Sequence, residues 1–532
     1  MDHDILEKPS ADFIEDTDNQ QLGHIANQED HELNKWQSLK KYPWTFAWCI
    51  YAVWCVLLVS FENQASGNVT GIPQFRQDFG HSYEGSWVLD AKWQSAFSGG
   101  PVASAVVGAL CSGQIADTIG RKLTILIALL ISVAAVTLEF RATTNEMFFG
   151  GKIFEWICCW CSCFSTDYLY WRALRGVLTC LTALAYVIGP LVVALITNWT
   201  GVYTNRWAYR AVFVAQYGYA AIALALVPFM PESPWWLVSK DRDEKAKKSL
   251  HRLGYTAEES MKKIAMVRNT LEEVRRETEG VTYFECFRRS NLRRTIVSIM
   301  PVCIQALSGV TFTAGYSTYY MQLAGYSTSM SFKLQIVQQV LSLIGNVMSY
   351  FVIDRVGRRN VMVYGLGILT AILMVTGGLG VVGSQTANPN AAGAIKGTVA
   401  LILVFCWWYN LTIGAAAYTI LAEVSTSRLR IKTIAIGMAL QNALYTMWSF
   451  VLPYLFNPDQ ANLGAKVSFV FGGHCVICLV YLWFFQPETT NRTYGELDEM
   501  FMKKVPARKF KGYRTDAEAM GAAAKEDSGV FV

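Results

Sequence analysis

One carboxyl stands where an apolar stretch ends. Glu62 closes the first long apolar stretch of the chain, in the sequence Phe61-Glu62-Asn63-Gln64. Low-dielectric surroundings disfavour the ionised form of a carboxyl, so a glutamate inside a membrane helix can load and release a proton near neutral pH. Glu62 is therefore a candidate proton site. The alternative is an interfacial glutamate at a helix end, already solvated, and the sequence leaves both open.

Two short charged turns offer a second kind of chemistry, ion pairing. Gly113–Lys122 and Asp354–Arg359 each lie between two apolar stretches, and they are near copies of one another. Short turns rich in Lys and Arg mark the cytoplasmic side of a membrane hairpin. Because a little under half of the chain separates the two copies, the duplication indicates two homologous halves.

The composition predicts the elements that must position these groups. Of 532 residues, 52% are hydrophobic and 16% are charged, against about 25% charged in a soluble domain. A membrane-spanning helix needs about 20 mostly apolar residues. Twelve stretches qualify: 45–62, 92–113, 122–140, 146–166, 174–197, 209–229, 294–316, 332–353, 360–383, 398–422, 431–455 and 467–486.

A charged segment divides these stretches six and six. We expect a disordered N-terminal tail (1–42), a first six-helix bundle (43–229), a linker with short helices (230–293), a second bundle (294–486) and a C-terminal tail (487–532). Since the cation-rich turns share one side with the linker and both tails, both termini are expected in the cytoplasm. A net charge of +5 with no basic stripe gives no indication of nucleic-acid binding.

Four motifs now point to a family. Gly113–Lys122, Pro231–Leu237, Gly414–Arg428 and Pro487–Thr493 resemble, in this order, motifs of the sugar porter family of the major facilitator superfamily. The chain is most similar to fungal hexose and α-glucoside (maltose-type) permeases. The resemblance implies an all-α membrane protein with twelve transmembrane helices in two six-helix bundles. It further implies a monomer in the plasma membrane that moves a sugar and a proton by alternating access, without enzymatic activity, metal or cofactor.

The resemblance also implies a sugar site between the two bundles. Amides and hydroxyls are suited to sugar hydroxyls, and aromatic rings to the apolar face of a sugar. The family's helix 7 pattern is QQxSGxN, in which Ala306 and Thr311 replace two amides here, so the sugar is left open. The expected substrate-binding residues are Gln305, Ser308, Thr311, Tyr316, Tyr418, Gln441 and Asn442. An acidic residue of helix 1 carries the proton in proton-coupled members, and Glu62 matches it.

Charged residues at the inner helix ends are expected to form a gate. In the family such residues pair across the two bundles and hold the inner side shut in the outward-facing state. The expected gate consists of Asp117, Arg121, Arg175, Glu232, Asp354, Arg358, Glu423, Arg428 and Arg430. The alternative, that they only set topology and cap helices, accounts for the cations but not for the neighbouring acids.

Residues 155–171 depart from the family. They contain an alternating run of Trp and Cys where helix 4 should be rich in Gly and Ala, and Tyr168 and Trp171 stand where Glu and Pro are expected. Gly codons read out of phase give Trp and Cys codons, so we hypothesise a local frame error restored by about Ala173. A cysteine site for a metal is the alternative, although the spacing matches no usual ligand set.

Three other functions stay open beside proton symport. Facilitated diffusion of a sugar needs the same fold without coupling. A sugar sensor, or a homologue impaired in transport by the altered helix 4, fits the same motifs. An enzyme is not expected, since no H-E-x-x-H, G-x-S-x-G or P-loop pattern is present.

Overall fold

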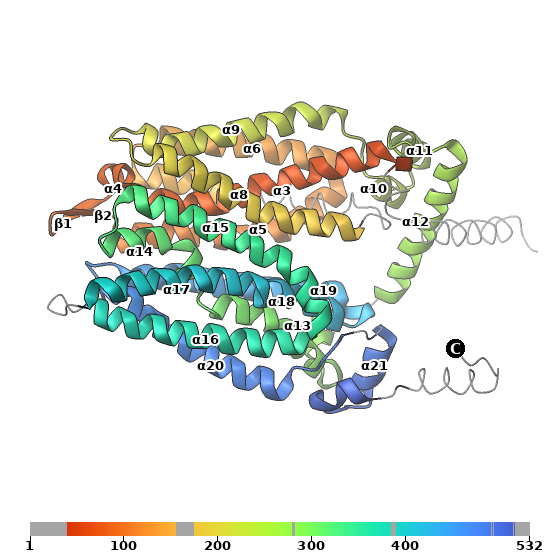
Figure 1. Cartoon of the computed structure of the whole chain (residues 1–532). Coiled ribbons are helices and arrows are strands. Elements are labelled where there is room, and N and C mark those ends of the chain that lie inside the picture. Colours follow the sequence, from red (N-terminus) through yellow and green to blue (C-terminus); the bar gives the residue numbers. More distant parts are fainter. Residues whose placement is uncertain are drawn as a thin grey trace, which may run out of the picture.

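The computed structural model describes residues 40–155, 175–278, 282–384, 390–490, 492, 494–513 and 515. Its helices form two layers (Figure 1). The first half holds α3 (Pro43–Thr70), α5 (Ala91–Ile119), α6 (Arg121–Arg141), a helical segment over residues 145–155, α8 (Arg175–Thr200) and α9 (Trp207–Leu226). The second half holds α13 (Arg289–Leu307), α15 (Thr328–Val356), α16 (Arg358–Gly383), α17 (Ala391–Leu411), α18 (Ile413–Val424), α19 (Arg430–Phe456) and α20 (Val467–Phe485).

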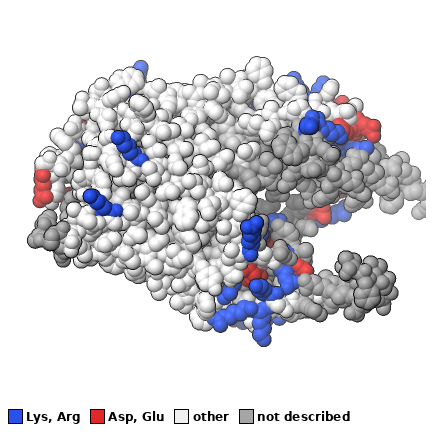
Figure 2. Space-filling view, viewed as in Figure 1, with Lys and Arg blue, Asp and Glu red and all other residues white. Residues whose placement is uncertain are grey.

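Every expected span overlaps a helix of the described residues, the fourth only over 145–155. In this part of the chain eight spans pass a test of length and apolarity, and a bent α5 makes a possible ninth. α17 and α18 together form one of the eight, broken at Thr412. The middle of the molecular surface is almost free of charge, and charged side chains gather over the end that carries α11, α12 and α21 (Figure 2). This distribution is typical of a membrane-spanning protein.

Short elements cover the two ends of the molecule. One end, which we call the hairpin end, carries α4 (Pro73–Phe79) and an antiparallel hairpin of β1 (His81–Tyr83) and β2 (Ser86–Val88), in which His81 pairs with Val88. The opposite linker end carries α10 (Pro234–Ser239), α11 (Asp243–Arg252), α12 (Ala257–Thr278), η3 (Tyr283–Phe287), α21 (Tyr494–Met502) and η7 (Ala507–Gly512). The remaining short elements are η2 (Val227–Phe229), η4 (Thr311–Gly315), α14 (Ser317–Leu323), η5 (Ser427–Leu429) and η6 (Gly464–Lys466).

The linker helices are attached to the first half by charge as well as by apolar packing. Lys41, just before α3, forms an ion pair of 2.7 Å with Glu259 of α12, and the Tyr42 hydroxyl donates to the same carboxylate at 3.1 Å. Burial opposes ionisation of Glu259, but hydrogen bonds from Lys41, the Thr256 amide and Tyr42 outweigh it and lower its pKa to about 2. Glu259 is therefore ionised at neutral pH and holds α12 beneath α3.

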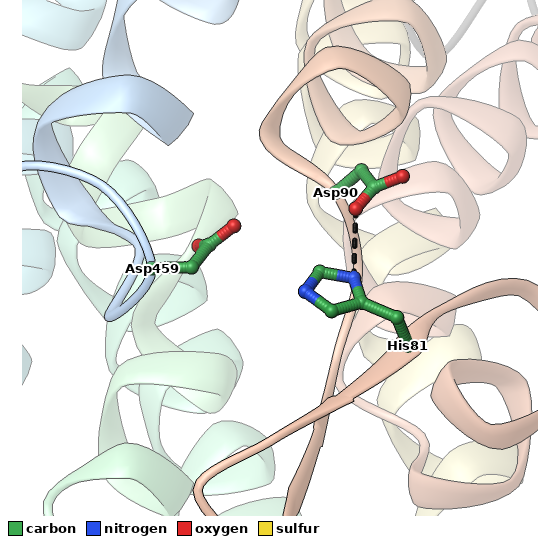
Figure 3. A group of neighbouring side chains, drawn as sticks. All are labelled: His81, Asp90 and Asp459. Carbon is green, nitrogen blue, oxygen red and sulfur yellow. Dashed lines mark ion pairs between the residues drawn. The ribbon is translucent and has the colours of Figure 1, made fainter.

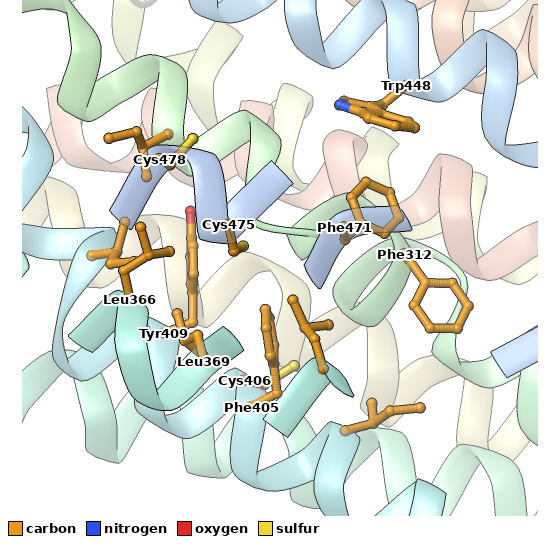
Figure 4. Close-up of a cluster of buried hydrophobic side chains, with 14 of the residues drawn as sticks. Phe312, Leu366, Leu369, Phe405, Cys406, Tyr409, Trp448, Phe471, Cys475 and Cys478 are labelled. Carbon is orange, nitrogen blue, oxygen red and sulfur yellow. The ribbon is translucent and has the colours of Figure 1, made fainter. Parts of the chain in front are cut away.

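Each half has its own apolar core. In the second half, aromatic, aliphatic and cysteine side chains of α13 to α20 interlock, among them Phe312, Phe405, Tyr409 and Phe471 (Figure 4). The eight cysteines whose side chains are described are free thiols, seven of them buried. The first half packs closely enough that a Cβ added at Gly189 of α8 would come within 2.1 Å of the Ser60 hydroxyl oxygen on α3. Close packing of these cores holds the helices of each half in fixed positions around its buried polar residues.

Candidate functional site

Glu62 lies inside the first half and not at a helix end. α3 continues about two turns beyond it, to Thr70, so the expected end of this span at residue 62 is wrong. The side chain is 1% exposed, which excludes the solvated, interfacial alternative. Ser66 and Asn68, which follow Glu62, are buried, and Asn68 accepts a hydrogen bond from Gln335 of the second half.

The carboxylate of Glu62 has buried partners on three sides. Lys152, in the helical segment over residues 145–155, forms an ion pair with one oxygen, and Gln216 of α9 donates to the other. The Ser66 hydroxyl, one turn further along α3, donates at 3.3 Å. Lys152 is fully buried, between the rings of Phe148 and Phe213 at 5.4 and 5.2 Å. A charged hydrogen-bond network in an apolar interior is typical of a proton-handling site.

Two further carboxyls, which the sequence analysis missed, complete this cluster. Glu139 of α6 lies 2.9 Å from the Lys152 ammonium, and both side chains are fully buried. One carboxylate oxygen from each of Glu62, Glu139 and Glu155 lies within 4.8 Å of the other two. A signal was present in the sequence, because Glu139 and Lys152 are charged residues inside apolar stretches. We use the name carboxyl cluster for Glu62, Glu139, Glu155, Lys152 and Gln216.

Three of the expected sugar-binding residues form one hydrogen-bonded chain in the second half. The Gln441 amide of α19 donates to the Gln305 carbonyl oxygen of α13 at 2.6 Å, and the Tyr418 hydroxyl of α18 donates to Gln441 at 3.2 Å. Gln305 in turn donates to the backbone oxygens of Ile413 and Gly414 at 3.1 and 2.8 Å, beside the break between α17 and α18. We call Gln305, Gln441 and Tyr418 the amide chain.

The other expected sugar-binding residues lie near the amide chain on the same helices or their extensions. The Ser308 hydroxyl donates to the Gln305 backbone oxygen at 2.7 Å, so it is used within its own helix. The Thr311 hydroxyl is buried and has no hydrogen-bond partner in the described part of the chain. Tyr316 donates to Ser98 of the first half at 3.1 Å. Asn442 follows Gln441 on α19 and is partly exposed.

The two charged turns have the same architecture. Gly120 and Gly357 take φ values of +96° and +95°, which favour glycine, and start α6 and α16. Glu232 accepts from the Arg121 and Lys122 amides at 2.9 and 3.2 Å, and Glu488 accepts from the Arg358 amide at 2.9 Å. A carboxylate at a helix N-terminus satisfies free amides and the helix dipole. In both halves, therefore, a glutamate caps the helix that follows the charged turn. Glu232 belongs to the motif Pro231–Leu237, and Glu488 belongs to the motif Pro487–Thr493.

Two ion pairs of these turns, among the described side chains, join residues of the same half. Arg121 pairs with Asp117 at 2.7 Å, and Arg358 pairs with Glu423 at 3.3 Å. Arg428 is exposed and Arg430 starts α19. The side chains of Arg175 and Asp354 lie outside the described residues. Pairing across the two halves in another conformation stays a prediction.

At the hairpin end the two halves are joined directly. The Arg76 guanidinium donates to Gln322 at 2.6 Å, Gln322 donates to the Gly71 oxygen at 2.7 Å, and Asn457 donates to the Leu89 oxygen at 3.1 Å. Nearby, His81 pairs with Asp90 at 2.7 Å, and Asp459 of the second half faces this pair (Figure 3). This conformation is therefore closed at the hairpin end.

Residues 48–501 match the family described as Sugar (and other) transporter. The chain belongs to this family of sugar transporters. The fold agrees: the transporter can be superposed on the inward-open xylose transporter XylE from E. coli with a TM-score of 0.67, at 17% identity, over 85% of this chain and 99% of that one. A D-xylose–proton symporter superposes with a TM-score of 0.63, at 17% identity, over 84% and 99% of the chains.

Relatives of this sugar transporter include yeast permeases. It is 29% identical to a general α-glucoside permease of Saccharomyces cerevisiae over 91% of this chain and 80% of that one. It is 28% identical to a maltose permease of the same species over 95% and 83% of the chains. The aberrant stretch predicted at residues 155–171 lies outside the described residues, apart from Glu155.

Proposed function

We propose that this transporter moves a hexose or an α-glucoside such as maltose across the plasma membrane together with a proton, by alternating access. The buried ion pair between Glu62 and Lys152 is the observation that carries the coupling. A carboxylate held by an ammonium in an apolar interior can exchange its partner for a proton, and this exchange changes the charge of the site. Kinship with α-glucoside and maltose permeases supports the class of substrate.

The amide chain is proposed as the sugar-binding wall. Amide groups that already hold one another in place present their remaining donors and acceptors without further ordering, which favours binding of a hydroxyl-rich ligand. Tyr418 is 46% exposed and supplies an aromatic face at the end of the chain. Thr311 supplies a buried hydroxyl that is free to bond a ligand or water.

The proposed orientation places the linker end and both termini in the cytoplasm. Arg121, Arg358 and the linker's charges lie at that end, as the positive-inside rule requires of a cytoplasmic face. With this orientation, closure at the hairpin end makes the present conformation inward-facing. The gate residues would then exchange their pairs within each half for pairs across the halves when the inner side closes.

The test is external pH in a lightly buffered suspension of transporter-deficient yeast that expresses the protein. Glucose, maltose and other sugars are added one at a time. Alkalinisation on one sugar, lost in Glu62→Gln, is the expected result and identifies the substrate. Protein at the cell surface that takes up labelled sugar without a pH change would identify a uniporter. Surface protein with no uptake of any sugar would refute transport, in favour of a sensor or a damaged helix 4.

A further inference from the structure

The carboxyl cluster holds more acid than base. Three fully or almost fully buried glutamates, Glu62, Glu139 and Glu155, face a single ammonium, that of Lys152. With every group ionised the cluster would carry a net charge of −2. A buried charge without a partner is so unfavourable that a titratable group takes or releases a proton instead. Protons must therefore be bound here whenever the site is closed to water.

The contacts separate the three glutamates into two classes. Glu62 and Glu139 each form an ion pair with Lys152. Glu155 makes no ion pair with Lys152 in the described part of the chain. A fully buried carboxyl without a cation is best accommodated as the neutral acid. Glu155 thus contributes no charge, and Lys152 is shared by two carboxyls.

We propose that Glu139 is a second proton-binding residue, and that the transported proton is bound by Glu62 and Glu139 as a pair around Lys152. With both carboxylates ionised, the pair and the ammonium carry a net charge of −1. Binding of one proton from water to either carboxylate gives a carboxylic acid and leaves the other carboxylate paired with Lys152, so the net charge becomes zero. Only this neutral form can be closed off from water without an unpaired charge.

The remaining neighbours do not alter this count. Gln216 of α9 and Ser66 of α3 contact Glu62, and Phe148 and Phe213 contact Lys152; all four are uncharged. No further charged group supplies an ion pair to the cluster among the described residues. The consequence is specific: removing either carboxyl of the pair leaves one carboxylate and one ammonium, which are neutral together without any proton.

This inference rests on the proposed proton symport and is tested on the sugar that causes alkalinisation. The measured quantity is the number of protons taken up per labelled sugar, which does not depend on how much protein reaches the membrane. We expect one proton per sugar for the wild type and none for Glu139→Gln or Glu139→Leu. Either variant should still exchange sugar in counterflow, and uptake should stop at equilibrium instead of accumulating. Glu139→Asp, which restores a carboxyl, should restore coupling.

Glu146→Gln is the matched control, because Glu146 lies on the same helical segment as Lys152 but is exposed and outside the carboxyl cluster. It should keep one proton per sugar. Coupled uptake by Glu139→Gln or Glu139→Leu at the wild-type ratio would overturn the proposal, since Glu62 alone would then bind the proton. Loss of coupling in Glu146→Gln would also overturn it, because coupling would then not depend on the carboxyl cluster alone. A wild type that moves sugar without protons would refute the proposed symport itself, which distinguishes that failure from this one.

Discussion

Replacement of Lys152 by Met should destabilise the protein strongly at neutral pH and weakly in acid. The ammonium is fully buried and is the only cation paired with Glu62 and Glu139 in the described part of the chain. Without it, one more carboxyl must bind a proton for the chain to fold. Breaking a buried pair by removing one partner typically costs about 3–5 kcal/mol.

The pH dependence of this cost follows from the ordinary carboxyl pKa of about 4.3. Forcing a proton onto such a group costs about 1.4 kcal/mol for each pH unit above that value, because the unfolded chain has released it. The penalty is thus about 3.7 kcal/mol at pH 7 and about 1 kcal/mol at pH 5. The sign is fixed: the folded variant binds more protons than the unfolded one, so its stability falls as the pH rises.

The assay is thermal unfolding of the detergent-solubilised, fluorescently tagged protein at several pH values. The gap in melting temperature between wild type and Lys152→Met should shrink about fourfold from pH 7 to pH 5. Lys92→Met, at an exposed lysine of α5, is the control and should leave a small gap at both pH values. A gap for Lys152→Met that is unchanged or larger at pH 5 would refute the account of a shared buried ammonium.

Three further predictions concern other parts of the molecule. Gln305→Leu and Gln441→Leu should each raise the KM for sugar about fivefold, the equivalent of about 1 kcal/mol. The double variant should have a KM little higher than either single variant, because the two amides bind each other. Additive effects on KM in a double-mutant cycle would contradict this. Gly189→Ala should abolish surface expression because its Cβ has no room against α3, whereas Gly218→Ala, with open space, should be tolerated; equal surface fluorescence of tagged variants would be the contrary result. The ion pair of Glu259 should protect the linker from proteolysis at neutral pH. Because the pKa of Glu259 is lowered in the folded protein, this protection should be lost only as the pH falls from 4.5 to about 2. A rate of linker cleavage that already rises between pH 7 and pH 5 would argue against it.

The sequence predicted the all-helical membrane fold, because apolar stretches and cationic turns act locally. The motif glutamates Glu232 and Glu488 were recognised by resemblance, but their role as helix caps required the fold, since each lies over 100 residues from the amides it binds. The first span was predicted too short because the polar residues after Glu62 look like a helix end, whereas the helix continues through them, with Ser66 and Asn68 buried and Asn68 bonded to the second half.

The carboxyl cluster was predicted only in part. Glu62 was recognised from its place in helix 1, but the other members of the cluster come from three other segments. Burial of Glu139 or of Lys152 alone in an apolar stretch would be energetically unfavourable. Burial of both is tolerated only because they lie next to each other and form an ion pair. The pairing of Gln305 with Gln441 could not be predicted either, since 136 residues separate them and only the packing of α13 against α19 joins them.

The two polar constellations do not share a half. The carboxyl cluster is built from α3, α6, α9 and residues 145–155, whereas the amide chain is built from α13, α18 and α19. Under the roles proposed for these residues, mutations that change the range of sugars can accumulate in one half while the proton-binding residues of the other half stay unchanged. Gene duplication, followed by divergence of the half that holds the amide chain, would give a set of transporters for different sugars that share the same proton coupling. Exchange of whole halves between relatives would be a direct route to new combinations.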